Sequence, residues 1–140
     1  LWDGEHSVAG AIHCGWRSSV GDILKNALDA MASLGAEARS VHAAIGPSIG
    51  RCCFETDDDV PQAIERYLSG DTDGLFDRCA DGKTMVDLRA ANARRLVQLG
   101  VLPENIDVSD ECTYCRHDKY WSHRYTHGQR GSQAALIVLD

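Results

Sequence analysis

Residues 8–17 read VAGAIHCGWR, and this stretch leads an apolar segment directly into four chemically distinctive residues. A short run of small and β-branched apolar residues predicts a buried strand. Gly15 allows the backbone to turn sharply or to approach a ligand closely. We therefore expect a strand that ends at a functional site, where His13, Cys14 and Arg17 are gathered.

A helix is predicted directly after this site. Ser18 and Ser19 are candidate N-caps, and Gly35 is a typical residue at the C-terminal end of a helix. The unpaired N–H groups at the start of such a helix, beside His13 and Arg17, suit an anion such as phosphate or a metal-bound substrate. His13 and Arg17 could equally be an ordinary hydrogen-bonded histidine and a surface ion-pair former. Apolar residues recur at helical spacing through this segment: Val20, Ile23, Leu24, Ala27, Leu28 and Met31.

Further elements follow in the middle of the chain. Residues 41–45 predict a second buried strand, closed by the loop GPSIG at 46–50. Three aspartates at 57–59 predict the acidic start of a short helix. A longer helix is predicted from Asp87 to Gly100, and three arginines should face away from its apolar stripe: Arg89, Arg94 and Arg95.

The remaining segments complete the predicted fold. Residues 69–84 are rich in Gly and Asp and predict an irregular connection. Residues 106–108 predict a short strand, and residues 120–125 should pair with 133–139 as a hairpin. Because strands and helices are mixed rather than strictly alternating, we expect an α+β fold with a mixed β-sheet flanked by helices.

Length and composition set limits on the class of protein. A chain of 140 residues makes one domain that can bury a real core, which we place at residues 1–140. The net charge of −7 argues against binding to nucleic acid and favours a small-molecule partner. No apolar run approaches the ~20 residues of a membrane span, so we expect a cytoplasmic protein without membrane association. The chain begins with Leu1 and reaches its first strand within ten residues, so we expect a fragment of a longer protein.

Six cysteines are present, and we expect them to be reduced thiols. Cys112 and Cys115 form a C-x-x-C pair, with three histidines close behind, at 117, 123 and 127. A structural zinc site normally draws a second ligand pair from elsewhere, and the sequence offers no second C-x-x-C or H-x₃₋₅-H outside this cluster. We therefore favour a loop with a partly buried cysteine pair over a zinc site.

Four motifs together resemble the laccase-domain family, also called YfiH-like, or the polyphenol oxidoreductase and purine nucleoside phosphorylase family. They are HCGWR at 13–17, GPSIGRCCFE at 46–55, CTYC at 112–115, and SHR at 122–124 leading to Arg130. They occur in the family's order across almost the whole chain. The resemblance implies a YfiH-like laccase domain that lacks its N-terminal portion.

The resemblance also implies an activity and a site. Family membership implies a zinc-dependent purine nucleoside phosphorylase with adenosine deaminase activity, so the partners would be a purine nucleoside and phosphate. His13 matches a family metal ligand, whose partners, a His and a Cys, lie further upstream. Zinc with an open position would lower the pKa of bound water to about 7. Arg17, Arg124 and Arg130 match family arginines and are the candidate substrate-binding residues.

Other functions remain open at this point. A copper-dependent polyphenol oxidase would need clustered histidines, but the chain has six histidines, no H-x-H pair, and neither Met31 nor Met85 placed for a blue-copper site. A cysteine hydrolase would pair His13 with an upstream thiolate, because Cys14 should point to the opposite face of the strand. The last alternative is that the chain is a binding domain without catalytic activity. Zinc stoichiometry would separate the metalloenzyme from the last two.

Some residues depart from the family pattern, and they bear on substrate preference more than on fold: Ser18, Arg51, His123 and Tyr125. For the 140 residues alone we expect no metal at His13 and no activity. An apolar sheet surface that the upstream portion would cover should be exposed, which favours a homodimer or aggregate.

Overall fold

The computed structural model describes residues 1–139. Residues 1–139 contain four α-helices and three small sheets, and the predicted α+β class is confirmed. The elements are, in chain order, β1 (Trp2–Asp3), β2 (Val8–Ala9), α1 (Trp16–Val20), α2 (Ile23–Ser33), β3 (Ala43–Ile45), β4 (Glu55–Thr56), α3 (Asp59–Tyr67), β5 (Phe76–Arg78), β6 (Thr84–Val86), α4 (Leu88–Gln98), a 3-10 helix (Pro103–Asn105) and β7 (Ile106–Val108). No helix in residues 1–139 is long and apolar enough to cross a membrane.

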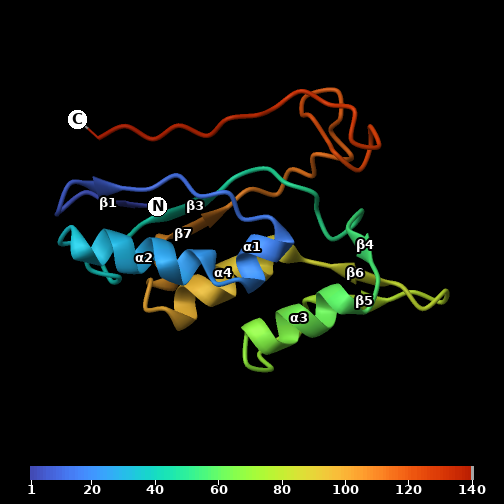
Figure 1. Ribbon diagram of the computed structural model, residues 1–140, viewed down its shortest axis with the longest axis horizontal. Coiled ribbons are helices and arrows are strands. Elements are labelled where there is room, and N and C mark those ends of the chain that lie inside the picture. Colours follow the sequence, from blue (N-terminus) through green and yellow to red (C-terminus); the bar gives the residue numbers. More distant parts are fainter. Residues whose placement is uncertain (140) are drawn as a thin grey trace.

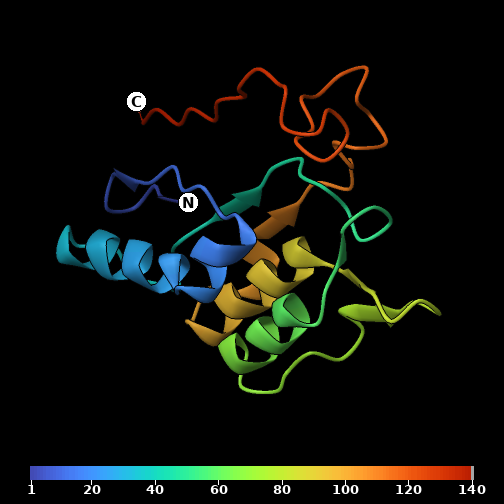
Figure 2. The ribbon, with the colours of Figure 1, turned by 45° about the vertical axis from the view of Figure 1, so that its right-hand side comes forward.

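A parallel strand pair, β3 with β7, lies at the centre of the molecule. Helices α1, α2 and α4 lie on one side of this pair, while the segment after residue 116 runs along the opposite side (Figures 1 and 2). β1 and β2 form an antiparallel pair at one end, and β4, β6 and β5 form an antiparallel sheet at the other. Both strand orientations are therefore present, and they are distributed over three small sheets.

Two apolar clusters hold these layers together. The first joins α2 to β3 and the end of α4 through buried side chains such as Leu28, Val41 and Leu96. The second joins α3 to β6 and the start of α4 through side chains such as Ile64 and Val86. Trp16 and Val20 of α1 pack against the second cluster, together with Ile49. The HCGWR motif and the GPSIG loop are thereby anchored on the same apolar cluster.

The predicted single helix after the HCGWR motif is wrong, because it is broken at Gly21 and Asp22. Asp22 has a left-handed backbone, with φ of 62°, and begins α2 without a side-chain cap. Its carboxylate accepts two hydrogen bonds from Arg95, at 3.0 and 2.6 Å. This ion pair ties the break to α4. Ser18 and Ser19 lie inside α1 and cap nothing, and the strand before them is only Val8–Ala9.

The predicted C-terminal hairpin, residues 120–125 paired with 133–139, is also wrong. Residues 120–125 form turns in which backbone donors are satisfied locally, as in the hydrogen bond from Thr126 N to Ser122 O at 3.1 Å. Residues 133–139 have no strand partner within the described chain. A hairpin lies instead at β5 and β6; β5 falls within the segment 69–84 predicted to be irregular, and β6 begins at its last residue.

The predicted acidic start of a short helix is confirmed by α3, which has Asp58 at its N-cap and Asp59 in its first turn. Among residues 1–139, no side chain caps this helix; Asp57 pairs with Lys83, and Asp58 pairs with Arg78. The arginines of α4 do not simply face solvent. Besides Arg95, Arg89 is partly buried and donates to the carbonyls of the loop after β7.

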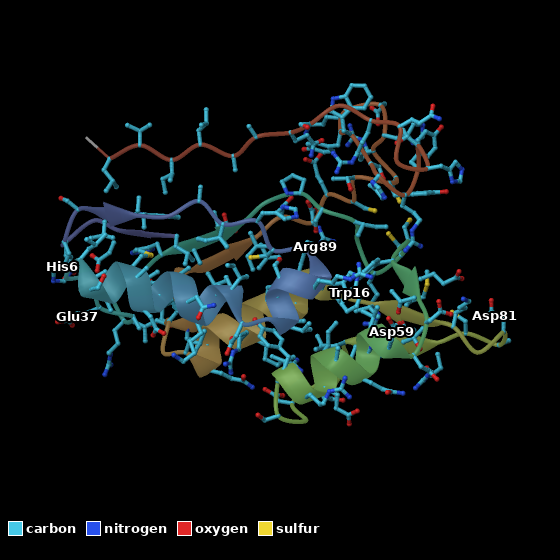
Figure 3. All side chains as sticks on the ribbon, in the orientation of Figure 1. His6, Trp16, Glu37, Asp59, Asp81 and Arg89 are labelled. Atoms are coloured by element: carbon cyan, nitrogen blue, oxygen red, sulfur yellow. The ribbon has the colours of Figure 1, made fainter. Side chains whose placement is uncertain are left out.

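Asp3 is a buried carboxylate that organises the N-terminal end. It accepts hydrogen bonds from the backbone of Glu5, His6 and Glu37, from the His6 ring at 2.8 Å, and from Ser40 Oγ at 2.6 Å. His6 and Glu37 lie at the same end of the molecule (Figure 3). Burial alone would raise the pKa of Asp3, but these donors outweigh it and hold that pKa well below its usual range.

Candidate functional site

His13 lies in the irregular stretch between β2 and α1, where Gly15 is the N-cap residue. A Cβ atom on residue 15 would lie 3.2 Å from His13 Nε2, so a glycine lets the imidazole fold over the turn. Ser18 Oγ can donate to the carbonyls of His13 and Gly15, each at 2.9 Å. These bonds fix the backbone on the C-terminal side of an exposed histidine.

Arg17 follows on the first turn of α1. Its guanidinium lies 4.4 Å from the centroid of the Trp16 ring, a cation–π contact, and Trp16 in turn packs on the second apolar cluster. Arg17 is exposed and has no carboxylate partner among residues 1–139. α1 has only five residues, so the cationic character of this corner comes from Arg17 itself.

Arg124 and Arg130 lie elsewhere, on the C-terminal segment. Arg124 Nη1 donates to the carbonyl of Glu55 at 3.0 Å, and its guanidinium lies 5.8 Å from the Phe54 ring centroid. Arg130 bonds only to the carbonyl of its neighbour Gly131 within the described chain. The structure thus joins Arg124 to the CCFE end of the second motif, while Arg130 makes no side-chain hydrogen bond beyond its neighbouring residue within the described chain.

Cys14 is half-buried against the first apolar cluster. Burial raises the pKa of its thiol, with a small opposing effect from the N-terminal ammonium group. A protonated, half-buried thiol is a poor nucleophile, in keeping with the expectation that Cys14 does not act with His13.

No group of three or more potential metal ligands in residues 1–139 includes His13. A catalytic zinc site needs about three protein ligands. The described chain therefore supplies one ligand of the set that the family resemblance implies, and the set is not complete within it.

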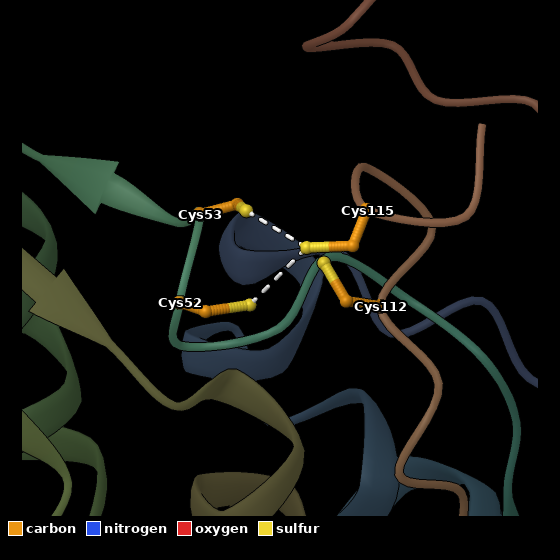
Figure 4. A group of neighbouring side chains, drawn as sticks. All are labelled: Cys52, Cys53, Cys112 and Cys115. Atoms are coloured by element: carbon orange, nitrogen blue, oxygen red, sulfur yellow. Dashed lines mark hydrogen bonds between the residues drawn. The ribbon is translucent and has the colours of Figure 1, made fainter.

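A different ligand cluster is present, and sequence reasoning missed it. Cys52, Cys53, Cys112 and Cys115 bring four sulfur atoms within 4.8 Å of one another (Figure 4). Cys115 Sγ lies 3.4 Å from Cys53 Sγ and 3.7 Å from Cys52 Sγ. The second pair that a zinc site requires is thus the adjacent Cys52 and Cys53, which no C-x-x-C pattern reveals.

Two loops are held together to form this cluster. Ser48 and Cys112 form a bridge, in which Thr113 N donates to Ser48 O at 2.9 Å. Gly50 N donates to Cys112 Sγ at 3.2 Å. A Cβ on residue 50 would lie 3.2 Å from Cys112 Cβ and 3.0 Å from Arg89 Nη2, so only glycine lets the loops approach this closely.

The thiols of this cluster have unequal proton affinities. Burial alone would raise the pKa of Cys112, but the backbone N–H groups of Cys115 and Gly50 stabilise its thiolate and lower the pKa to about 6. Burial beside the other sulfurs raises the pKa of Cys52 and Cys53. Without a metal ion, Cys112 is therefore the thiolate, while Cys52 and Cys53 remain protonated at neutral pH.

A separate open depression of about 740 Å³ lies between α4 and β7. Its lining includes Asp87, Arg89, Arg94 and Asp110 but none of the four predicted site residues. Because His13 does not line this depression, the candidate functional residues remain those around His13 and Arg17 and the four clustered cysteines.

Comparison with known proteins now bears on these sites. The sequence pattern of the family described as "Multi-copper polyphenol oxidoreductase laccase" matches residues 1–140. A protein named adenosine deaminase RL5, from an unknown prokaryotic organism, is 38% identical over 124 residues, which are 89% of this chain and 47% of that protein. Purine nucleoside phosphorylase YlmD of Geobacillus stearothermophilus is 32% identical over 131 residues, covering 93% and 48%.

A solved structure is similar over the same region. The hypothetical protein YfiH of Bacillus licheniformis matches with a TM-score of 0.86 and 30% identity, over 91% of this chain and 48% of that one. The chain spans about half the length of the curated relatives it matches. With the whole sequence matched and the fold shared, the chain belongs to the multi-copper polyphenol oxidoreductase laccase family, the YfiH-like proteins.

Proposed function

We propose that this chain is the C-terminal part of a single laccase-like domain that cleaves purine nucleosides with phosphate and deaminates adenosine. Support comes from relatives named purine nucleoside phosphorylase and adenosine deaminase, at 32% and 38% identity. The observation that carries the proposal is the corner at the start of α1. There an exposed imidazole is folded over Gly15, and it is followed by the guanidinium of Arg17, which has no carboxylate partner in residues 1–139.

His13 is proposed as one ligand of a zinc ion whose other ligands come from outside this chain. Its exposure and its fixed backbone suit that role. Zinc, when bound, would supply an activated water for attack on the purine ring. The described residues supply only this one ligand of the set.

Arg17 is proposed to bind phosphate. A bound phosphate dianion needs fixed positive charge, and Arg17 offers a guanidinium whose plane is positioned by Trp16 and engaged by no carboxylate in residues 1–139. Arg124 and Arg130 are proposed as further substrate-binding residues, with Arg124 anchored through Glu55. Oxidation of phenols at copper ranks second, because the described chain has no histidine cluster that would hold several copper ions.

The test uses the complete protein that contains this chain. It should convert adenosine, inosine and guanosine to free base and ribose 1-phosphate only when phosphate is present, and convert adenosine to inosine without phosphate, as followed by chromatography. His13→Ala should abolish both reactions while circular dichroism stays unchanged. Full activity of His13→Ala would overturn the assignment of this residue, and absence of both reactions in the unmutated protein would overturn the proposed function.

A further inference from the structure

We propose that Cys52, Cys53, Cys112 and Cys115 bind one zinc ion as a tetrathiolate site. This site is separate from His13 and does not depend on the proposed function. It would be structural, because all four coordination positions are filled by protein sulfur and none is left open for water.

The arrangement of the sulfur atoms fits the ion. In a regular tetrahedron with Zn–S bonds of about 2.3 Å, the sulfur atoms lie about 3.8 Å apart. Cys115 Sγ lies 3.7 Å from Cys52 Sγ and 3.4 Å from Cys53 Sγ, and all four sulfur atoms lie within 4.8 Å of one another. Binding would therefore require only small side-chain movements.

The ligands face a common centre because the backbone of two loops places them there. Cys52 and Cys53 come from the turn that follows Gly50, while Cys112 and Cys115 come from the turn after β7, and the two turns face each other (Figure 4). The bridge between Ser48 and Cys112 fixes their relative position. Four thiols converge here, although a disulfide would use only two, and soft thiolate ligands select zinc over hard cations.

The surroundings also suit an anionic centre. Zinc with four thiolates carries a net negative charge, which needs nearby donors and cations. Gly50 N already donates to Cys112 Sγ at 3.2 Å. The guanidinium of Arg89 lies close to the same glycine and is held in place by the carbonyls of Ser109 and Glu111. N–H···S bonds and a fixed guanidinium stabilise bound thiolates.

The experiment measures metal in the 140-residue chain, purified with reductant, loaded with Zn²⁺ and dialysed. We expect one zinc per chain, loss of zinc in Cys52→Ser and Cys115→Ser, and full retention in the matched control Cys79→Ser, whose thiol lies outside the cluster. His13→Ala should also retain this zinc, so failure of the proposed function would leave the result unchanged. Retention of zinc in a Cys52→Ser, Cys115→Ser double variant would overturn the proposal.

Two measurements on the unmutated chain keep the test valid if a variant fails to fold. Co²⁺ should give the intense visible ligand-field bands and sulfur charge transfer of a tetrahedral tetrathiolate site. Thiol titration of the zinc-loaded chain, followed to completion, should find at most the two thiols outside the cluster, Cys14 and Cys79, and all six after chelation in denaturant. Cobalt spectra without sulfur charge transfer would show that no tetrathiolate site forms. An intact mass two hydrogens lower than that of the reduced chain, unchanged by chelator, would show a disulfide in place of the metal site.

Discussion

Asp3 is a single residue on which the N-terminal end depends. Its carboxylate joins the turn after β1 to the segment between α2 and β3, through the donors of His6, Glu37 and Ser40. Asp3→Asn should destabilise the chain, because an amide cannot accept all of these bonds and must bury its own N–H groups. Urea denaturation at neutral pH measures the loss.

The pH dependence follows from the lowered pKa of Asp3. A carboxylate with a lowered folded-state pKa contributes stability that is fully present above its unfolded pKa, about 3.9, and is lost as the pH falls through the folded value. The unmutated chain should therefore lose stability steeply in acid, while Asp3→Asn shows a weaker slope. Equal slopes for both proteins would show that Asp3 is not the titrating group.

Arg17 is the residue whose role the proposed function states most sharply. In the complete protein, Arg17→Ala should raise the KM for phosphate at least about tenfold, a loss of about 1.4 kcal/mol of binding. Adenosine deamination, which uses no phosphate, should change little. Arg39→Ala, an exposed arginine on the loop before β3, is the control. Equal loss of both reactions would assign Arg17 to nucleoside binding or folding instead.

Helices and the central strands show how much a sequence can predict at the scale of elements. α2, α4, β3 and β7 follow from apolar periodicity, because each buries one face on a nearby cluster. The break at Gly21 and Asp22 was missed, since its partner Arg95 is 73 residues away. The cysteine cluster was missed for the same reason: its two pairs are about 60 residues apart, and periodicity reports only local order.

The ion pair of Asp22 with Arg95 links the helix break to α4. Arg95→Met keeps an unbranched apolar side chain over Tyr67 but removes the bidentate bond, and Asp22 then lacks its partner. Because the pair is only partly exposed, we expect a loss of about 1 kcal/mol. Lys25→Met, which breaks an exposed pair with Asp29, should cost about 0.3–0.5 kcal/mol. Urea denaturation compares them, and similar losses would contradict a special role for Arg95.

Gly50 offers a test of the loop geometry. Gly50→Ala places a methyl group 3.2 Å from Cys112 Cβ and 3.0 Å from Arg89 Nη2, so the loops must separate. The melting temperature should fall and retention of zinc should weaken. Gly46→Ala is the matched control in the same loop, because nothing lies within 4 Å of its added Cβ. If Gly46→Ala and Gly50→Ala behave alike, the close approach at residue 50 is not needed.

At the scale of the whole molecule, the C-terminal segment leaves apolar side chains in solvent. Leu136 is 91% exposed and Val138 is 83% exposed, on an extended segment with no strand partner in residues 1–139. Exposed apolar surface favours association. Sedimentation velocity should show concentration-dependent dimers or larger species for the 140-residue chain. A Leu136→Glu, Val138→Glu variant should be more monomeric than Leu34→Glu, which changes an exposed residue at the end of α2. A monomer at all concentrations would contradict this expectation.

The wide separation of the two cysteine pairs also has a consequence for how the chain is made. Cys52 and Cys53 leave the ribosome about 60 residues before Cys112 and Cys115. At about 5–20 residues per second, the first pair waits about 3–12 s for its partners. During that interval, two adjacent thiols are accessible to oxidants or to a passing metal ion. Synthesis in a reducing compartment therefore matters more for this chain than its finished structure suggests, because the two loops meet only after about 60 further residues have been made.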